Sequence, residues 1–188
     1  GEALLGKKTG YRAAAWGAVL GTVPDLDVLA GPFIDSVTEL QFHRGFTHSI
    51  LFCLIASPVF GWLINRIHTT KNAGWKMWSV MAFMVFATHI FIDVLTTYGT
   101  QIFFPFSNYP VTADSVYIID PLYTLPLFFC LVTALFWNRL SNKRRILNYL
   151  GLTLSSFYLI WGLGIKPHIT SVFASSFVNQ LGRYDYIK

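Results

Sequence analysis

Charged residues are scarce in this sequence. Only 12% of its 188 residues are charged, whereas 54% are hydrophobic and 17% are aromatic. A soluble domain of this size could not bury so much apolar surface, so the composition excludes an ordinary soluble domain and indicates a membrane protein. The formal net charge is +5 and the pI is about 9.3. However, the basic residues form short clusters between apolar runs, which is typical of membrane-protein flanks and argues against a nucleic-acid partner.

Cysteine is also scarce. Cys53 and Cys130 lie inside apolar runs, without a partner at metal-binding or redox spacing. This excludes a disulfide framework and a zinc knuckle, and it predicts that both are small core residues. The sequence has no signal peptide, internal repeat or low-complexity segment, and it begins at Gly1 without an initiator methionine. We therefore expect a further segment upstream.

The apolar runs predict an all-α fold, an integral membrane helical bundle with about four spanning helices. The runs long enough to cross most of the roughly 30 Å hydrocarbon core cover residues 49–64, 75–95, 121–137 and 146–165. A shorter run at residues 13–23 would rise only about 16 Å as a helix, so it predicts an N-terminal half-span.

A domain boundary is expected at Lys166-Pro167. Beyond it, apolar residues recur at steps of three and four, which predicts a short amphipathic helix at the membrane surface. We therefore expect a membrane-embedded domain at residues 1–166 and an amphipathic surface tail at residues 167–188, where a soluble extension begins.

The basic clusters predict the orientation of the bundle. If every predicted span crosses the membrane, alternation places three clusters on one side, and together they hold ten of the 14 Lys and Arg residues: Lys7 to Arg12, Arg66 to Lys76 and Arg139 to Arg145. The positive-inside rule makes that side cytoplasmic. Alternation then gathers four polar stretches on the non-cytoplasmic side, around Asp25, His43 to Ser49, His89 to Asp93 and Asp120.

His89 and Asp93 are spaced four apart within a predicted span. On a helix both side chains project from one face, about one turn apart, which is a suitable pair of metal ligands. The alternative is a polar pair satisfied inside a helix bundle. Ionisable pairs at membrane depth are costly and usually functional, so we favour metal ligation.

Asp25 and Asp27 directly follow Pro24, which ends the preceding helix. Taken alone, such a stretch is often just a solvated turn. Two adjacent carboxylates repel each other, however, and a cation would hold both ionised and close together. Placed opposite two imidazoles, they are predicted ligands.

His43 and His48 flank Gly45, where the backbone can turn so that both rings face one point. Either histidine alone would more often be a satisfied core residue. Neutral imidazole with carboxylate suits zinc, manganese or iron better than calcium. One tetrahedral ion uses fewer than six ligands, so either two ions bind or some residues support the others: Asp25, Asp27, His43, His48, His89 and Asp93.

Four further polar residues on the non-cytoplasmic side each have more than one possible role. Arg44 could clamp an anionic oxygen such as a phosphate, or it could anchor at the headgroups or pair with Glu39. Thr47 and Ser49 are expected to cap the next helix. Asp120 precedes a proline at the start of a span, which favours a helix N-cap over a role beside the metal.

Several of these residues resemble a known family in order and spacing. They are Pro24-Asp25-Leu26-Asp27, the stretch His43-Arg44-Gly45-Phe46-Thr47-His48-Ser49, and His89 with Asp93, Thr96, Gly99 and Pro105. The chain resembles the bacterial inner-membrane YdjM family of metal-dependent hydrolases, also called LexA-regulated inner-membrane-associated hydrolases. The resemblance implies a helical membrane bundle, a metal site and a phospholipase-like activity. It also implies a further upstream histidine, so the ligand set here is expected to be incomplete.

The sequence thus predicts a membrane-bound hydrolase of the bacterial inner membrane that uses one or two zinc or manganese ions. It would cleave a phosphoester or similar bond of a lipid or envelope substrate at the non-cytoplasmic face, by metal-activated water. Asp27 or Asp120 could act as general base, with Arg44 stabilising developing charge. A metal-ion or proton transporter using the same cluster is the alternative, and a membrane scaffold with a structural metal is a third possibility. The clustering of the polar residues at one end favours the hydrolase. Membrane lipids are the expected partners. The sequence does not indicate how many copies of the chain associate.

Overall fold

A computed structural model describes residues 1–33, 44–68, 72–117 and 120–184. Within these ranges the chain forms helices and loops without strands, which confirms the predicted all-α class. The elements are α1 (Glu2–Thr9), α2 (Tyr11–Thr22), the 3₁₀ helices η1 (Pro24–Phe33) and η2 (Phe46–His48), α4 (Ile50–Ile67), α5 (Trp75–Leu95), α6 (Pro121–Leu135) and α7 (Asn142–Tyr184).

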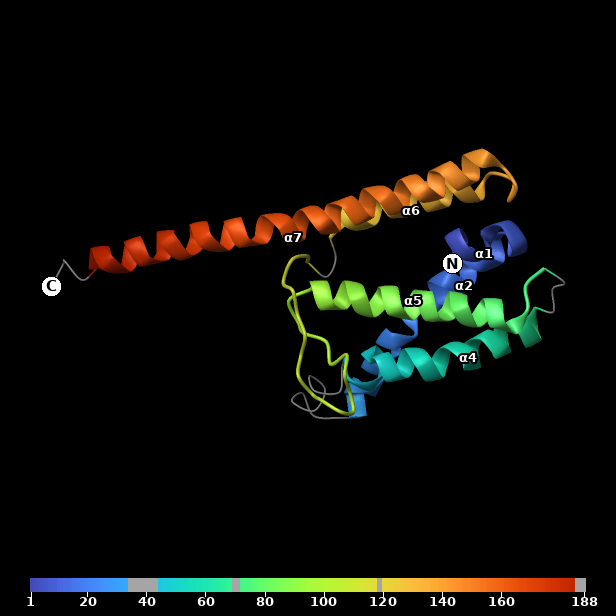
Figure 1. The fold of residues 1–188 in the computed structure, drawn as a ribbon, viewed down its shortest axis with the longest axis horizontal. Coiled ribbons are helices and arrows are strands. Elements are labelled where there is room, and N and C mark those ends of the chain that lie inside the picture. Colours follow the sequence, from blue (N-terminus) through green and yellow to red (C-terminus); the bar gives the residue numbers. More distant parts are fainter. Residues whose placement is uncertain (34–43, 69–71, 118–119, 185–188) are drawn as a thin grey trace.

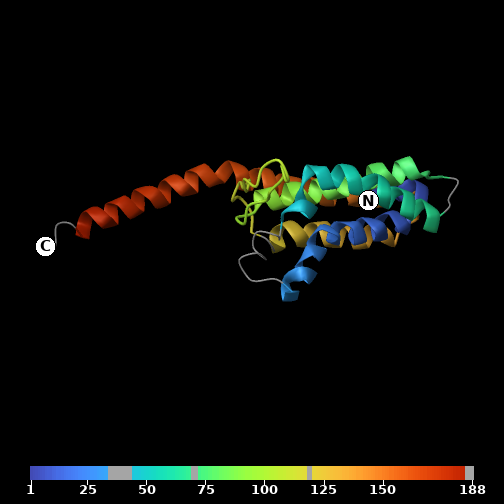
Figure 2. The same cartoon turned by 90° about the horizontal axis from the view of Figure 1, so that it is seen from below.

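Two antiparallel helix pairs build the bundle. α4 packs along α5, and α6 packs along α7, while α1 and α2 lie between the two pairs (Figure 1). α7 continues well beyond the end of the bundle, and the view from below shows the same protruding helix (Figure 2). The predicted half-span corresponds to α2, which contacts α5.

The sequence signals for helix ends are observed. Ser49 caps α4 by accepting a hydrogen bond from the Phe52 amide at 3.1 Å. Asp120 caps α6 in the same way, with 2.9 Å between its Oδ1 and the Leu122 amide nitrogen. The predicted caps at Ser49 and Asp120 are therefore confirmed. Thr47 lies inside η2 and makes other contacts, described below.

The main core lies between α4 and α5. Trp78, Met81 and Phe86 of α5 are fully buried there, together with Ile64 of α4 and Leu20 of α2. Cys53 belongs to this core, as its apolar surroundings predict, and Cys130 is partly buried. Apolar burial on this scale holds α5 rigidly, which fixes the side chains of its last turns.

Three described helices are long and apolar enough to cross a membrane: Ile50–Ile67, Trp75–Leu95 and Asn142–Phe177. α6 has 15 residues and is shorter than these. Such a helix rises about 22 Å, less than the roughly 30 Å core. Large apolar side chains such as Trp62, Phe128 and Trp161 are exposed on the outer faces, as expected for surfaces that contact lipid.

Lys166-Pro167, where we predict a domain boundary, lies inside a continuous helix, and the division into two domains stays a prediction. α7 runs through Pro167 as one helix, so the proposed boundary at residue 166 falls inside it. A proline removes one backbone hydrogen bond, and apolar helices tolerate this loss when neighbouring groups compensate. Lys166 is held against the bundle here, because its Nζ donates to the Ala113 carbonyl at 2.5 Å. Residues 167–177, beyond it, are exposed on all sides, including the apolar Ile169, Val172, Phe173 and Phe177, and the amphipathic surface helix stays a prediction.

The basic clusters meet at one end of the bundle. Lys8 Nζ lies 3.4 Å from Met77 Sδ, and Arg139 donates to the Lys8 carbonyl at 3.4 Å. η1, η2 and the 96–117 loop lie at the other end (Figure 1). The predicted separation of basic clusters from the Asp and His residues is therefore present in the fold.

Candidate metal centre

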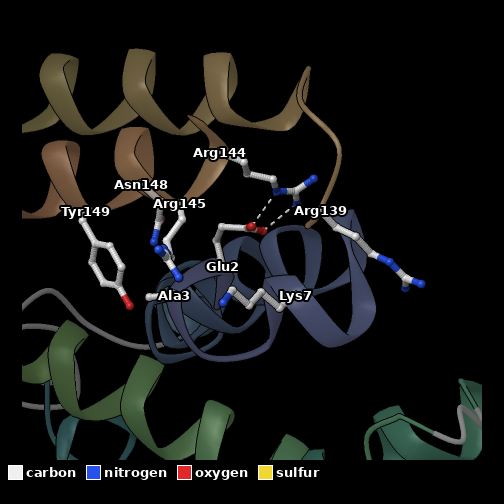
Figure 3. A pocket seen from close by; sticks show the side chains of 8 residues that line it. All are labelled: Glu2, Ala3, Lys7, Arg139, Arg144, Arg145, Asn148 and Tyr149. Atoms are coloured by element: carbon white, nitrogen blue, oxygen red, sulfur yellow. Dashed lines mark hydrogen bonds and ion pairs between the residues drawn. The ribbon is translucent and has the colours of Figure 1, made fainter. Parts of the chain in front are cut away.

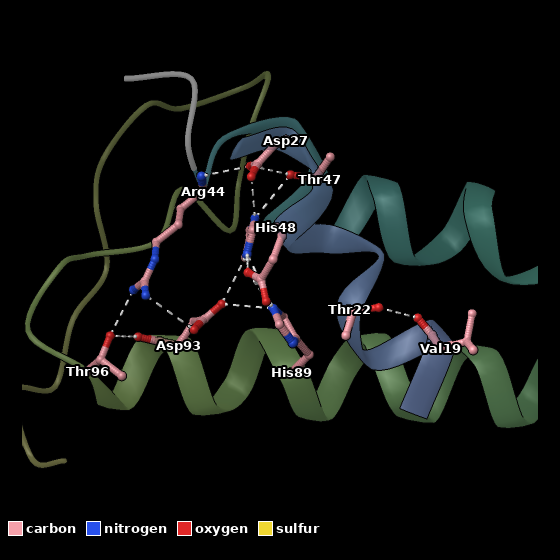
Figure 4. Close-up of polar contacts among 10 residues, drawn as sticks. Val19, Thr22, Asp27, Arg44, Thr47, His48, His89, Asp93 and Thr96 are labelled. Atoms are coloured by element: carbon pink, nitrogen blue, oxygen red, sulfur yellow. Dashed lines mark hydrogen bonds and ion pairs between the residues drawn. The ribbon is translucent and has the colours of Figure 1, made fainter. Parts of the chain in front are cut away.

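Three segments far apart in sequence converge at the end opposite the basic clusters. η1 carries Asp25, η2 carries His48, and the end of α5 carries His89 and Asp93. The helix-stopping Pro24 turns the chain from α2 into η1, and the Ser49 cap starts α4 directly after His48. These two chain reversals bring Asp25 and His48 over the last turns of α5 (Figure 4).

The four side chains direct one ligand atom each toward a common point. His48 Nε2 lies 3.3 Å from Asp25 Oδ1 and 3.2 Å from Asp93 Oδ2. His89 Nε2 lies 3.4 Å from the same Asp25 atom and 3.3 Å from the same Asp93 atom. The two imidazole nitrogens are 3.3 Å apart. All four atoms lie within 4.8 Å of one another.

Five of the six separations match those around a tetrahedral metal ion, and the sixth pair, Asp25 Oδ1 and Asp93 Oδ2, lies within 4.8 Å. Atoms at the corners of a tetrahedron, each about 2.0–2.1 Å from its centre, are about 3.3–3.4 Å apart. In addition, Asp93 Oδ2 is buried and makes no hydrogen bond to any residue that the structure describes. A cation among the four atoms would satisfy this oxygen and the two facing nitrogens at once. Asp25, His48, His89 and Asp93 could therefore hold a metal ion.

The centre is closed on one side and open on the other. His48 is fully buried, and the His89 and Asp93 side chains are largely buried. The Asp25 side chain, in contrast, is 54% exposed. Catalytic metal sites use three protein ligands and leave the fourth position to water, so the exposed Asp25 is the ligand that water could replace.

Asp25 and His48 lie outside the candidate membrane-spanning helices, and each affects the pKa of the other. Burial would raise the pKa of Asp25, but hydrogen bonds with His48 and His89 outweigh it and hold the pKa below its usual range. Burial would lower the pKa of His48, but its close contacts with the Asp25 and Asp93 carboxylates outweigh this effect and raise the pKa. Because the pKa of His48 is raised, protonation of its ring competes with metal binding.

Asp27 lies behind His48, outside the group of four. Its Oδ2 accepts from the Thr47 hydroxyl at 2.9 Å and from the Arg44 amide at 3.3 Å, and it lies 3.7 Å from His48 Nδ1. Thr47 Oγ1 is 3.1 Å from that Nδ1. Since the Thr47 hydroxyl donates to Asp27, its oxygen is left to accept from Nδ1–H. This arrangement leaves the lone pair of Nε2 for a metal.

Arg44 supports Asp93 from the other side. Its Nη1 donates to Thr96 Oγ1 at 2.8 Å, and its Nη2 lies 3.5 Å from Asp93 Oδ1. The guanidinium lies over the Tyr98 ring, 5.2 Å from its centroid. Arg44 thus engages Oδ1 of Asp93 and leaves Oδ2 for the metal. Its role as a clamp for a substrate anion stays a prediction.

The backbone at Arg44 is left-handed, with φ of 62°. This conformation is unfavourable for a residue with a Cβ atom. Both of its peptide groups are bound: Asp27 accepts from its amide, and the Gln101 amide donates to its carbonyl at 3.1 Å. The surrounding contacts therefore impose the turn that brings η2 into the site.

Asp120, a predicted site residue, lies elsewhere in the fold. Asp120 accepts from the Leu122 amide and, through Oδ2, from the Tyr158 hydroxyl at 2.6 Å. It therefore joins α6 to α7 and does not belong to the group of four. His43 and Glu39 lie outside the described residues.

Sequence reasoning missed the partners of Arg44. Thr96 was noted as part of the family resemblance, and Tyr98 was not considered. The one available signal was their position directly after α5, at the same end of the bundle as the ligands.

A mostly apolar cavity of about 550 Å³ reaches His89. Its walls come from both helix pairs and from the α1–α2 segment. Lining side chains include Val85, Phe91, Tyr123, Leu127 and Leu159. The metal centre therefore adjoins an apolar space inside the bundle.

Comparisons with known proteins identify related sequences. A family model described as YdjM inner membrane protein matches residues 1–169. YfhP of Bacillus subtilis strain 168, described as an uncharacterized protein, is 30% identical over 99 residues, which cover 52% of this chain and 29% of YfhP. The match thus spans less than a third of that relative. No solved structure matches the chain.

Proposed function

This chain belongs to the YdjM inner membrane protein family, and we propose that it is a membrane-bound metal-dependent hydrolase. The observation that carries the proposal is the close grouping of four ligand atoms, one of which belongs to the solvent-accessible carboxylate of Asp25. Two imidazole nitrogens with two carboxylate oxygens suit zinc or manganese. When bound, such a metal supplies Lewis acidity, which polarises an ester oxygen and makes water a better nucleophile near neutral pH.

The residues of this chain hold and orient the site. Thr47 and Asp27 keep the Nε2 of His48 directed to the centre, and Arg44 keeps Asp93 in place. Asp25 is the only one of the four ligand residues that is exposed, so it is the ligand that water would replace, and its released carboxylate could then accept a proton from that water. We therefore place the general base at Asp25. Asp27 is buried behind His48, and Asp120 serves as a helix cap.

The proposed substrate is a phosphoester or similar bond of a lipid or envelope component. Support comes from the apolar cavity beside His89, which suits a substrate with a hydrocarbon part. The basic clusters lie at the opposite end of the bundle, so the positive-inside rule favours a site at the non-cytoplasmic face.

A metal-ion or proton transporter is the second candidate, because intramembrane Asp and His also line ion pathways. A transporter requires polar groups at several depths. Here the four ligand residues gather at one end, and Trp78, Met81 and Phe86 fill the described α4–α5 core toward the other end. This distribution favours the hydrolase.

The test is elemental analysis of the detergent-purified full-length protein together with hydrolysis of a phospholipid panel. We expect stoichiometric zinc or manganese and metal-dependent hydrolysis in the wild type, and loss of both in His48→Ala and Asp93→Asn. His168→Ala, at an exposed position on α7, is the matched control. A metal-free wild type, or undiminished hydrolysis by His48→Ala, would overturn the proposal. Metal uptake into liposomes without hydrolysis would establish the transporter instead.

A further inference from the structure

A strongly basic pocket lies at the end of the bundle opposite the metal centre. Its volume is about 170 Å³, and α1, the α6–α7 turn and the first turns of α7 form its walls (Figure 3). One acidic residue and four cationic residues line it: Glu2, Lys7, Arg139, Arg144 and Arg145. It shares Glu2, Ala3 and Asn148 with the apolar cavity that reaches His89, but it contains none of the metal-centre residues and does not depend on the proposed function.

The single acid is fully used by one of the cations. Arg144 Nε lies 2.7 Å from Glu2 Oε1, and its Nη2 lies 2.8 Å from Oε2, which is a bidentate pair. Both side chains are buried, and Arg144 also donates to the Trp137 carbonyl at 3.2 Å. This pair fixes α1 against α7 and cancels its own charge, so the other cations in the pocket are uncompensated.

Lys7 and Arg145 point their cationic ends into the same space beside Ala3, whereas Arg139 points away (Figure 3). In the ranges that the structure describes, neither Lys7 nor Arg145 pairs with a carboxylate. Two like charges facing one small pocket repel each other, and an anion between them would remove the repulsion.

The pocket also offers neutral hydrogen-bond donors. Asn148 and Tyr149 line it from α7, both about two turns inside the helix. Amide and hydroxyl donors beside two cations form a suitable receptor for a phosphate group. A water needs only about 10–15 Å³ of such volume, so a group of several heavy atoms fits.

We propose that this pocket binds the phosphate of an anionic phospholipid headgroup. α7 is a candidate membrane span, and Ile146 and Leu150, adjacent to the pocket residues, are exposed apolar side chains. Lys143 Nζ lies 4.3 Å from the Trp137 ring centroid at the same end. Cations with aromatic residues at the end of an apolar helix are typical of the headgroup level, and basic pockets between such helices bind anionic lipids.

The experiment measures lipid binding to the full-length protein by native mass spectrometry and thermal stabilisation. Phosphatidylglycerol, phosphatidylcholine and inorganic phosphate are compared as probes. We expect selective binding and stabilisation by phosphatidylglycerol. Lys7→Gln and Arg145→Gln should each weaken that binding about fivefold. The charge-conserving Lys7→Arg should retain it, which separates loss of charge from misfolding.

Arg66→Gln is the matched control. Arg66 belongs to another exposed basic cluster and lies over the Trp62 ring, outside the pocket. An effect of Arg66→Gln equal to that of Arg145→Gln would overturn the proposal, because diffuse charge would then explain binding. Inorganic phosphate that binds as tightly as phosphatidylglycerol would also overturn the lipid assignment and establish a free-phosphate site.

Discussion

His48 and His89 are 41 positions apart in sequence, yet their Nε2 atoms lie 3.3 Å apart. Their rings are tilted by 47°, with centroids 5.3 Å apart, so they meet through these nitrogens and do not stack. Each nitrogen also faces the same oxygens of Asp25 and Asp93. Two nitrogens and two oxygens in this arrangement could hold a metal ion between them.

Removal of either imidazole should abolish stable metal binding. His89→Ala leaves three of the four ligand atoms, and an incomplete tetrahedron binds zinc far more weakly than a complete one. We expect at least a hundredfold lower affinity, since even loss of an outer supporting group costs about 10–100-fold. Competition with a fluorescent chelator measures this. His68→Ala removes a histidine that packs near Trp16, away from the centre, and should bind like the wild type.

The Thr47 hydroxyl should tune the centre without touching the metal. Thr47→Val removes the link between Asp27 and His48 Nδ1, so the imidazole loses its fixed orientation. We expect about 10–100-fold weaker metal binding, and Thr47→Ser should restore it. In the cobalt-substituted protein, the visible absorption bands should shift in Thr47→Val and return in Thr47→Ser. Unchanged bands and affinity in Thr47→Val would show that the hydroxyl has only a packing role.

The four ligand residues could be predicted because their chemistry is unusual in apolar surroundings and helix alternation places them at one end. The different role of Asp27 could not, because a spacing of two does not define which side a residue faces. In a 3₁₀ helix, with three residues per turn, positions two apart point in different directions. Asp25 consequently faces the centre, while Asp27 faces the back of His48.

The contacts of Arg44 and the course of α7 also required the structure. Arg44 binds Thr96 and Tyr98, which come from a loop over fifty positions later, and no local pattern specifies that pairing. Pro167 is a strong local signal for a helix end. It was overridden because the apolar residues on both sides favour helix more strongly than one lost hydrogen bond opposes it.

The metal-free protein should lose stability as the pH rises. The pKa of His48 is raised in the folded state, so its contribution is present below about pH 6.5 and is lost as the pH passes through the raised value. The pKa of Asp25 is lowered, so its contribution is present above about pH 4 and disappears only at lower pH. Thermal unfolding of chelator-treated protein across this range checks the direction. Zinc should restore stability at high pH in the wild type but not in His48→Gln.

Substitutions of Asp120 can distinguish a structural role of its carboxylate from a catalytic one. Its side chain caps α6 and binds the Tyr158 hydroxyl, so Asp120→Ala should destabilise the protein by about 1 kcal/mol through the lost cap. Asp120→Asn keeps an N-cap oxygen and should be nearly as stable as the wild type. Because Asp120 stands outside the group of four, both variants should retain the metal, and Asp120→Asn should retain hydrolysis. If Asp120→Asn were stable and metal-loaded but inactive, the general base would be Asp120, and the assignment of that role to Asp25 would be wrong.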